Sequence, residues 1–299
     1  MRYLLLYNPV SGRGKIKKKV SLIQTIFKER NLSLDIYESK ECKDLINQAF
    51  LFSSKYDVFL VAGGDGTINE VVNGVMKADK KPSIAIIPTG TANDIASILG
   101  MKKKIRKSLD IILSTNPVLM DVNQMNDQYF IYTGSAGIFT RISYATKRKY
   151  VKSVGYLAYL LTGLKDVFKA YRIPLKIETN DKEIEGTYKL ALGLSTNRVA
   201  GMFLRGFVPN KLNDGKFEFR LFNRKGFSGM LAVLWFFITG GRYNKEKNLL
   251  SAKEYKITTT ETTAWNVDGE FSTTGSIEIK VHQQKLSVYV AHKSRKKYF

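Results

Sequence analysis

Apolar and polar positions follow a repeating order along the first part of the chain. Tyr3–Tyr7 is a continuous apolar run, typical of a strand buried on both faces, and residues 15–30 follow as a basic stretch with helical spacing. The same order returns twice, because apolar runs at 57–62 and 83–87 each precede a helical pattern. Strands that alternate with helices predict an α/β domain with a helix-flanked, mostly parallel sheet.

After about residue 130 the pattern becomes rich in short strands. The predicted strands are 175–178, 188–194, 217–222, 255–260, 277–281 and 286–290, and the predicted helices are 156–171 and 226–239. Residues 216–221 and 276–281 alternate with period two, which indicates sheets with one buried and one wet face. We therefore expect a second, β-rich antiparallel sandwich domain.

The change of pattern predicts where the domains divide. We expect an α/β domain over residues 1–130, onto which the tail 291–299 can pack back, and a β-rich domain over 131–290. No Pro- or Ser-rich linker marks the division.

Composition narrows the partners and the compartment. The 48 Lys and Arg residues against 26 Asp and Glu give a net charge of +22, which favours nucleic acid, anionic lipid headgroups or phosphorylated small molecules as partners. The single cysteine, Cys42, excludes an internal disulfide and fits a cytoplasmic protein. Two histidines are too few for a zinc site built from His and Cys.

The basic residues form clusters that suit a membrane surface. They lie at 15–19, 102–107, 147–152 and 293–297. The longest apolar run, 230–239, is too short to span a bilayer, so we expect peripheral association with an anionic membrane from one side. One apolar stripe beside these clusters fits either the membrane interface or the protein core. Its members are Tyr156, Tyr159, Leu160, Leu161 and Leu164.

The most informative loop is Gly63-Gly64-Asp65-Gly66-Thr67, between a predicted strand and a predicted helix at 67–76. Glycine accepts positive φ and allows backbone N–H groups to approach an oxyanion, and a helix N-terminus adds positive potential. An aspartate there suits a nucleotide-bound Mg²⁺. The alternative is an ordinary structural turn, since Gly-Asp-Gly is common turn chemistry.

Two further loops also follow predicted strands. They are residues 8–12 (Asn-Pro-Val-Ser-Gly) and residues 88–94 (Pro-Thr-Gly-Thr-Ala-Asn-Asp). Loops after parallel strands lie at one edge of a sheet, so we expect all three to converge. Neither the Walker A nor the dinucleotide-binding pattern is present. Asn93 and Asp94 also fit simple helix capping.

These three loops, together with Asn266-Val267-Asp268-Gly269-Glu270, resemble the diacylglycerol kinase catalytic family, in particular its bacterial soluble lipid kinases. The glycine loop by itself is also similar to that of NAD kinases and 6-phosphofructokinase relatives. The resemblance implies an NAD kinase/diacylglycerol kinase-like fold, ATP and Mg²⁺ as cofactors, and a lipid substrate with a free hydroxyl. It also allows a homodimer.

The resemblance assigns nucleotide contacts to a set of loop residues. They are Asn8, Pro9, Val10, Ser11, Gly12, Ser39, Gly64, Asp65, Gly66, Thr67, Ile68, Asn69, Glu70 and Thr91. Hydroxyls of Ser11, Thr67 and Thr91 and backbone N–H groups suit phosphate oxygens, and Asp65 suits the metal, so Asp65 is also a candidate catalytic residue.

The resemblance makes Glu270 the general base that deprotonates the acceptor hydroxyl. Asp268 is the rival base, and the residues alone do not separate the two. An ordinary hairpin turn is the alternative, because Asp-Gly is a favoured hairpin dipeptide.

The resemblance also implies a structural Mg²⁺ site at a second Asp-Gly. Its ligands would be the Asp214 carboxylate and the backbone carbonyls of Lys211 and Lys216. The chain departs from the family upstream, where Ala200-Gly201-Met202 replaces a glycine triplet. This departure means that the sequence does not determine the shape of the nearby pocket or the identity of the acceptor.

The leading prediction is an ATP- and Mg²⁺-dependent kinase that converts diacylglycerol to phosphatidic acid. Phosphatidylglycerol, an isoprenoid alcohol and a sphingoid base remain open as acceptors. One alternative is a kinase for NAD or a sugar phosphate, and another is a non-catalytic protein that binds an anionic membrane or nucleic acid. No RNA- or DNA-binding signature is present, so nucleic acid is not an expected partner.

Overall fold

The computed structural model describes residues 1–10, 16–138, 172–206, 211–223, 226–242 and 249–299. The chain forms two compact units, Met1–Val122 with Gln283–Phe299, and Asn123–His282. Strands β5 (Val118–Met125) and β18 (Ile277–Val288) carry the chain from one unit to the other. Because both passages are continuous strands, no linker marks them, and the predicted ranges place the divisions a few residues later along the chain.

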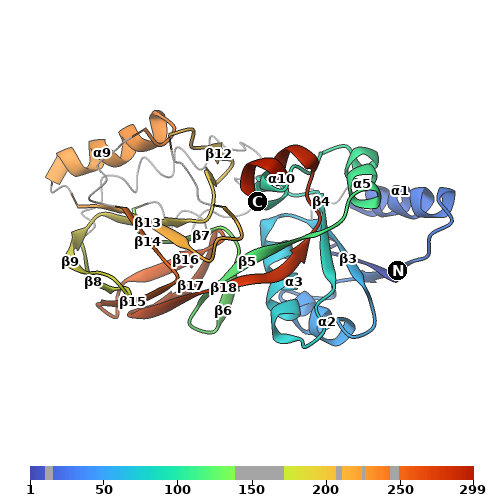
Figure 1. Ribbon diagram of the computed structural model, residues 1–299, viewed down its shortest axis with the longest axis horizontal. Helices are drawn as coiled ribbons and strands as arrows, with labels where there is room; N and C mark the ends of the chain where they lie inside the picture. The colour runs from blue at the N-terminus through green and yellow to red at the C-terminus, as the bar shows by residue number, and fades with distance from the viewer. Residues whose placement is uncertain (11–15, 139–171, 207–210, 224–225, 243–248) are drawn as a thin grey trace. The chain divides into compact units, whose positions relative to one another are not determined.

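The first unit contains a parallel sheet in the order β2-β1-β3-β4. Figure 1 labels its strands β3 and β4. Its strands are β1 (Tyr3–Tyr7), β2 (Leu34–Glu38), β3 (Val58–Gly63) and β4 (Ser83–Pro88). Its helices are α1 (Ile16–Glu29), α2 (Asp44–Phe52), α3 (Asp65–Lys77), α4 (Asp94–Ile98), α5 (Ile105–Ser114) and α10 (His292–Tyr298). All residues of β1 and β3 are buried, as their continuous apolar runs predict. The predicted helix-flanked parallel sheet is confirmed.

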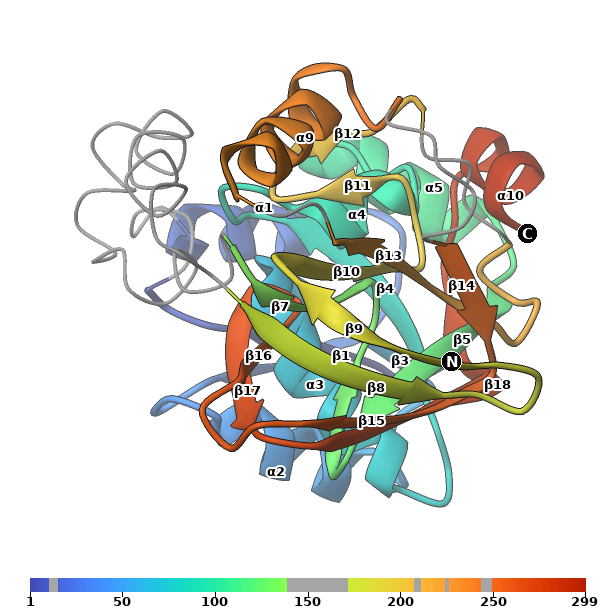
Figure 2. The ribbon, with the colours of Figure 1, turned by 90° about the vertical axis from the view of Figure 1, so that its left-hand side faces the viewer.

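The second unit contains two antiparallel sheets, which confirms the predicted β-rich sandwich class (Figure 2). One sheet has the order β18-β15-β8-β9, with β15 (Glu254–Thr259), β8 (Ile173–Glu178) and β9 (Glu183–Tyr188). The other has the order β14-β13-β10-β7-β16-β17, with β14 (Leu249–Ala252), β13 (Phe217–Phe222), β10 (Leu190–Leu194), β7 (Thr133–Gly137), β16 (Ala264–Val267) and β17 (Glu270–Thr274). Strand β6 (Gln128–Phe130) pairs with β5, the short strands β11 (Arg198–Val199) and β12 (Met202–Phe203) form a hairpin, and α9 spans Gly226–Ile238.

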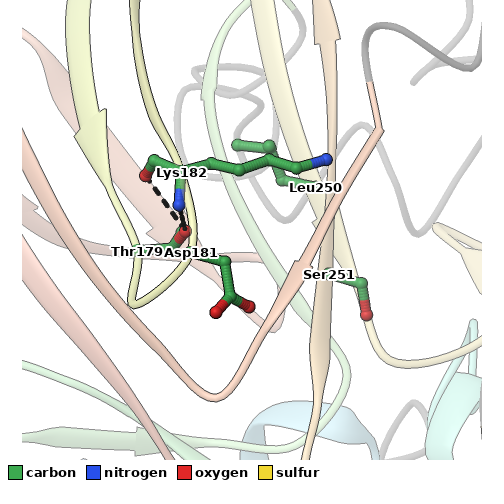
Figure 3. Close-up of a pocket in the computed structure, with 5 residues that line it drawn as sticks. All are labelled: Thr179, Asp181, Lys182, Leu250 and Ser251. Atoms are coloured by element: carbon green, nitrogen blue, oxygen red, sulfur yellow. Dashed lines mark hydrogen bonds between the residues drawn. The ribbon is translucent and has the colours of Figure 1, made fainter.

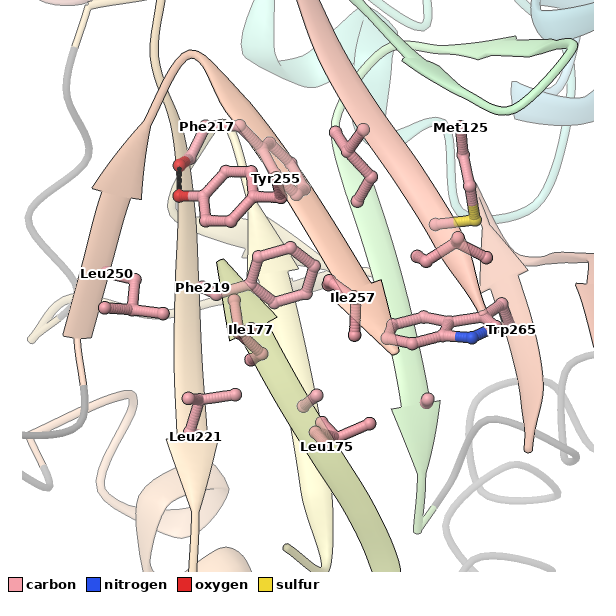
Figure 4. Packing of buried hydrophobic residues seen from close by; sticks show 14 of the residues in the cluster. Met125, Leu175, Ile177, Phe217, Phe219, Leu221, Leu250, Tyr255, Ile257 and Trp265 are labelled. Atoms are coloured by element: carbon pink, nitrogen blue, oxygen red, sulfur yellow. Dashed lines mark hydrogen bonds between the residues drawn. The ribbon is translucent and has the colours of Figure 1, made fainter. Parts of the chain in front are cut away.

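An aromatic cluster fills the core of the second unit (Figure 4). Phe217 and Phe219 of β13 meet edge to face with ring centroids 5.3 Å apart. The Tyr255 hydroxyl donates a hydrogen bond to the Phe217 carbonyl, and burial raises the pKa of this phenol. The fully buried Trp265 donates its Nε1–H to the Gly275 carbonyl at 2.9 Å. The two polar ring groups are therefore satisfied within an otherwise apolar core.

Strand β13 departs from its predicted pattern. Its alternating sequence predicts a wet face, yet all six residues are buried, including Glu218 and Arg220 at 3% and 7% exposure. Helix α9 explains the difference, because it packs on this face and brings the Phe236 ring 5.4 Å from the Arg220 guanidinium carbon. By contrast, residues 277–281 of β18 alternate between buried and exposed as predicted.

Other predicted elements are corrected or remain outside the described residues. The separate strands predicted at 277–281 and 286–290 form the single strand β18. The predicted helix at 156–171, with its apolar stripe, and the basic cluster at 147–152 lie outside the described residues. Among the helices that the structure describes, none has the length and apolar character needed to cross a membrane.

Candidate functional site

The candidate nucleotide residues follow the carboxyl ends of four neighbouring strands of the first unit. Ser39 follows β2, Asn8 follows β1, Gly64 follows β3, and the third loop follows β4. The strands are parallel and in close register, with Tyr7 opposite Ala62, and Gly63 opposite Pro88. The loops therefore emerge at one edge of the sheet, as expected from the strand pattern.

The glycine loop and the third loop touch each other. The N–H groups of Thr89 and Gly90 donate hydrogen bonds to the Gly63 carbonyl at 3.0 and 3.2 Å. A β-carbon at Gly90 would lie only 2.4 Å from the Gly64 Cα. Gly64 has a φ of −97°, so its need for glycine comes from this close approach and not from the positive φ expected from the sequence. The resemblance assigned no role to Gly90, although it is more sterically constrained than Gly64, whose added β-carbon would lie 3.2 Å from the Gly90 Cα.

Helix α3 begins at Asp65, directly after the Gly64 cap. The first N–H groups of a helix have no intrahelical acceptor, which makes this turn suited to an oxyanion. Thr67 is nearly buried, and Ile68 is fully buried and donates its N–H to the Gly64 carbonyl at 3.1 Å. Among the assigned residues Ile68 thus contributes packing, and its side chain is not available to a nucleotide.

Asp65 connects the glycine loop with the helix that follows the third loop. Its Oδ1 atom accepts a hydrogen bond from the Ile95 N–H at 3.0 Å, at the start of α4. Asn93, which the sequence offered as a cap for that helix, has a φ of 52° and makes no capping bond. Instead it holds Gly90 through two reciprocal bonds of 2.8 Å. Asn93 therefore occupies the N-cap position of α4 without a side-chain capping bond, and the Asp65 carboxylate accepts an N–H group of the first turn in its place.

The first loop is ordered at its start. Asn8 Oδ1 accepts the Val10 N–H at 3.0 Å, Pro9 is half-buried, and the Val10 side chain is exposed. Ser11 and Gly12 lie outside the described residues. On the neighbouring strand Ser39 is buried and donates its N–H to the Tyr7 carbonyl at 2.9 Å.

The remaining assigned residues of the first unit differ in exposure. Gly66, Asn69 and Glu70 are half-buried on α3, and Asn69 accepts two bonds from the Asn73 amide at 2.9 and 3.0 Å. Thr91 is exposed in the third loop. Thr91 is therefore reachable by a ligand, whereas the Asn69 side chain is also hydrogen-bonded to Asn73 on the same helix.

Glu270 lies at the start of β17, after a two-residue hairpin turn made by Asp268 and Gly269. These residues have φ values of 48° and 91°, as a hairpin with an Asp-Gly turn requires. The Gly269 N–H donates to Asn266 Oδ1 at 3.1 Å. The hairpin interpretation is correct, and it leaves the Glu270 side chain exposed.

Asp268 is held in a different environment. Its buried carboxylate accepts hydrogen bonds from the N–H groups of Ile131, Tyr132 and Thr133 at 2.8, 2.9 and 3.2 Å. A carboxylate bound by several backbone donors favours its charged form and fixes their segment in place. The two carboxylates thus differ, because Asp268 organises the backbone while Glu270 remains accessible. No sequence pattern at 131–133 predicts that these backbone N–H groups bind Asp268.

The predicted Mg²⁺ loop surrounds Asp214. Its carboxylate oxygens accept the Lys211 and Lys216 N–H groups at 3.2 and 3.1 Å, so the structure records donors from the two residues whose carbonyls were predicted as ligands. Burial raises the pKa of the Asp214 carboxyl. Each carboxylate oxygen has a second lone pair, and an all-oxygen loop suits Mg²⁺. Among the described residues no cluster of three or more His, Cys, Asp or Glu side chains suits a metal, so the site at Asp214 stays a prediction.

A small hollow in the second unit does not belong to this chemistry (Figure 3). Its volume is about 50 Å³, and its lining residues are Thr179, Asp181, Lys182, Leu250 and Ser251. Three hydrogen bonds between Thr179 and Lys182 close its turn. Ligand sites commonly have volumes of about 300–1,000 Å³, so this hollow suits neither a nucleotide nor an acyl chain.

Comparison with known proteins supports the same family from independent directions. Residues 2–125 match the diacylglycerol kinase catalytic domain. The chain is 30% identical over 273 residues to the diacylglycerol kinase of Staphylococcus carnosus, covering 90% of this chain and 89% of the relative. The Bacillus subtilis diacylglycerol kinase is also 30% identical, with 90% of each chain covered. A diacylglycerol kinase structure from Bacillus anthracis matches with a TM-score of 0.80, 25% identity and 98% of each chain covered. The chain therefore belongs to the diacylglycerol kinase family.

Proposed function

We propose that this kinase transfers the γ-phosphoryl group of ATP to a lipid hydroxyl in a Mg²⁺-dependent reaction, with diacylglycerol as acceptor and phosphatidic acid as product. The observation that carries the proposal is the contact between Gly64 and Gly90 at the start of α3. This contact builds a narrow, backbone-lined turn of the kind that suits phosphate oxygens. The relatives named diacylglycerol kinases support the lipid acceptor.

The donor side of the reaction uses the first unit. The N–H groups at the start of α3, the Thr67 and Thr91 hydroxyls and the loop from Asn8 to Gly12 orient the phosphates. When bound, Mg²⁺ neutralises the charge of the phosphate oxygens, and Asp65 is the residue proposed to hold it. Phosphoryl transfer depends mainly on such positioning and charge neutralisation.

The acceptor side uses Glu270. Its carboxylate takes the proton of the lipid hydroxyl while the new O–P bond forms and the bond to the β-phosphate oxygen breaks. ADP leaves with the electron pair of the broken bond. The phosphoryl group passes directly to the lipid, without a phosphoenzyme. Asp268 cannot readily share this role, because three backbone donors occupy its carboxylate.

The acceptor is tested by incubating the protein with labelled ATP, Mg²⁺ and a total lipid extract, and then identifying the labelled product. We expect phosphatidic acid from the wild type and none from Glu270→Gln, which should still bind ATP. Parallel reactions contain NAD or a sugar phosphate in place of lipid. Selective labelling of either soluble acceptor would overturn the lipid assignment.

A further inference from the structure

Helix α9 presents an apolar face to solvent. Its thirteen residues contain no charged side chain. Val233 and Phe236 are buried against β10 and β13, while Leu231, Trp235 and Ile238 are 48%, 60% and 75% exposed. The spacing of these three residues places them on one stripe of the helix. Figures 1 and 2 show α9 as the outermost element on this side of its sheet.

This stripe is unusual for a helix that covers a sheet. Such a helix normally buries its apolar face and presents charged or polar residues to water. Here the outward face is apolar as well, and Phe203 of β12 adds another exposed ring, at 40%. The β12 segment is joined to the end of α9 by a hydrogen bond of 2.7 Å from the Gly206 N–H to the Gly240 carbonyl.

The charges beside the stripe have one sign. The segments 196–206 and 226–242 contain Arg198, Arg205 and Arg242 and no Asp or Glu. Arg205 and Arg242 are exposed, next to the Gly206–Gly240 bond at the end of α9. Anionic headgroups complement this charge, whereas a second copy of these two segments brings no acidic side chain to pair with the arginines.

We propose that α9 docks on an anionic membrane, with Leu231, Trp235, Ile238 and Phe203 entering the boundary between headgroups and acyl chains. Arg205 and Arg242 then pair with lipid phosphates. Indole rings favour this boundary, and apolar area combined with basic charge is how an interfacial helix binds reversibly. The proposal rests on the proposed function only for the purpose of docking, which is to give a lipid kinase access to its acceptor. Docking itself requires no phosphoryl transfer.

The two tryptophans make the docking directly measurable. Trp265 is fully buried and hydrogen-bonded, so Trp235 is the residue whose emission responds to lipid. Phosphatidylglycerol vesicles should shift the wild-type emission to shorter wavelength, and brominated phosphatidylcholine in the same vesicles should quench it. Trp235→Phe should abolish both changes while the Trp265 signal persists.

Paired variants test the apolar and the basic parts. Leu231→Ser combined with Ile238→Ser should weaken vesicle binding at least roughly tenfold, since each side chain loses its apolar burial. The control Leu51→Ser removes a similarly exposed leucine, 56% exposed on α2, and should leave binding unchanged. Arg205→Ser with Arg242→Ser should weaken binding to anionic vesicles about 30-fold. Lys256→Ser, an exposed basic residue on β15, is the matched control for charge.

Two results would overturn the docking surface. One is vesicle binding without quenching of Trp235. The other is a lipid-free blue shift that grows with protein concentration and disappears in Leu231→Ser, which would identify a contact between copies. A monomeric short-chain diacylglycerol separates docking from function, because the Leu231/Ile238 variant should phosphorylate it like the wild type. If the wild type binds vesicles through Trp235 and phosphorylates no lipid, the proposed function fails and the docking surface stands.

Discussion

The Asp65 carboxylate accepts a hydrogen bond from the Ile95 N–H at 3.0 Å, and thereby joins the glycine loop after β3 to helix α4 after β4. One residue thus has two candidate tasks, because the same carboxylate is proposed to hold the nucleotide-bound metal. The cap uses one lone pair of Oδ1, and an ionised carboxylate has about four acceptor sites in all.

Substitutions at Asp65 should separate these tasks. Asp65→Asn retains an oxygen acceptor for Ile95, so stability should fall by less than about 0.5 kcal/mol while phosphoryl transfer falls at least roughly 100-fold. Asp65→Ala should also lose about 1 kcal/mol of unfolding free energy. Thermal melts and labelled-ATP assays measure the two effects. An Asp65→Asn enzyme with wild-type turnover would reduce the residue to a helix cap.

Gly90→Ala should disable nucleotide binding. The added β-carbon would lie 2.4 Å from the Gly64 Cα, which is backbone and cannot rotate away, so the two loops must separate. We expect a stability loss of about 1–3 kcal/mol and loss of ATP affinity by calorimetry. Gly275→Ala is the control, because its positive φ strains an alanine while its nearest neighbour is 3.6 Å away. It should lower stability and leave ATP affinity unchanged. Unchanged ATP affinity in Gly90→Ala would argue against a nucleotide site at this contact.

The exposed Glu270 and the buried Asp268 should respond oppositely to amide substitution. Glu270→Gln should leave stability within about 0.5 kcal/mol and reduce turnover roughly 100-fold or more. Asp268→Asn replaces a carboxylate oxygen by an NH₂ group facing backbone donors, so it should lose about 2–3 kcal/mol of stability. Denaturant melts beside transfer assays compare them. A stable but inactive Asp268→Asn, with active Glu270→Gln, would exchange their roles.

The sequence predicts those parts of the fold that depend on local pattern. The apolar runs of β1 and β3 identify buried parallel strands, and loops after such strands must lie at one edge of the sheet. Strand β13 shows where local pattern fails. Its alternation is real, but α9 covers the face that alternation leaves polar, and Arg220 then packs against Phe236.

The functional site also has a part that the sequence predicts and a part that it does not. The glycine loops are visible in the sequence because close backbone approach restricts residue type. The partners of Asp65 and Asp268 are backbone N–H groups, which every non-proline residue carries, so no side-chain pattern at Ile95 or at 131–133 reveals them. These contacts required the tertiary structure.

Alkaline pH should weaken the contact between β1 and the edge strand β2 through Tyr7. Burial, with a hydrogen bond to Glu38, raises the pKa of this phenol from 10.0 to about 12. Its contribution is fully present below the unfolded pKa and is lost as the pH rises from 10.0 towards about 12. Tyr7→Phe cannot ionise, so its unfolding free energy should fall less steeply over this range. Equal slopes in denaturant melts at several pH values would contradict the assignment.

Magnesium should stabilise the second unit through Asp214. Burial raises the pKa of this carboxyl, which means that its charge is costly without a cation. Bound Mg²⁺ offsets that cost, and a ligand at about 100 times its dissociation constant stabilises a fold by about 2.7 kcal/mol. Without nucleotide, Mg²⁺ should therefore raise the melting temperature of the wild type, and EDTA should reverse the rise. Asp214→Asn should show no rise, whereas Asp181→Asn, an exposed Asp in the β8–β9 turn, should behave like the wild type. The same Mg²⁺ response in both variants would exclude Asp214 as the ligand.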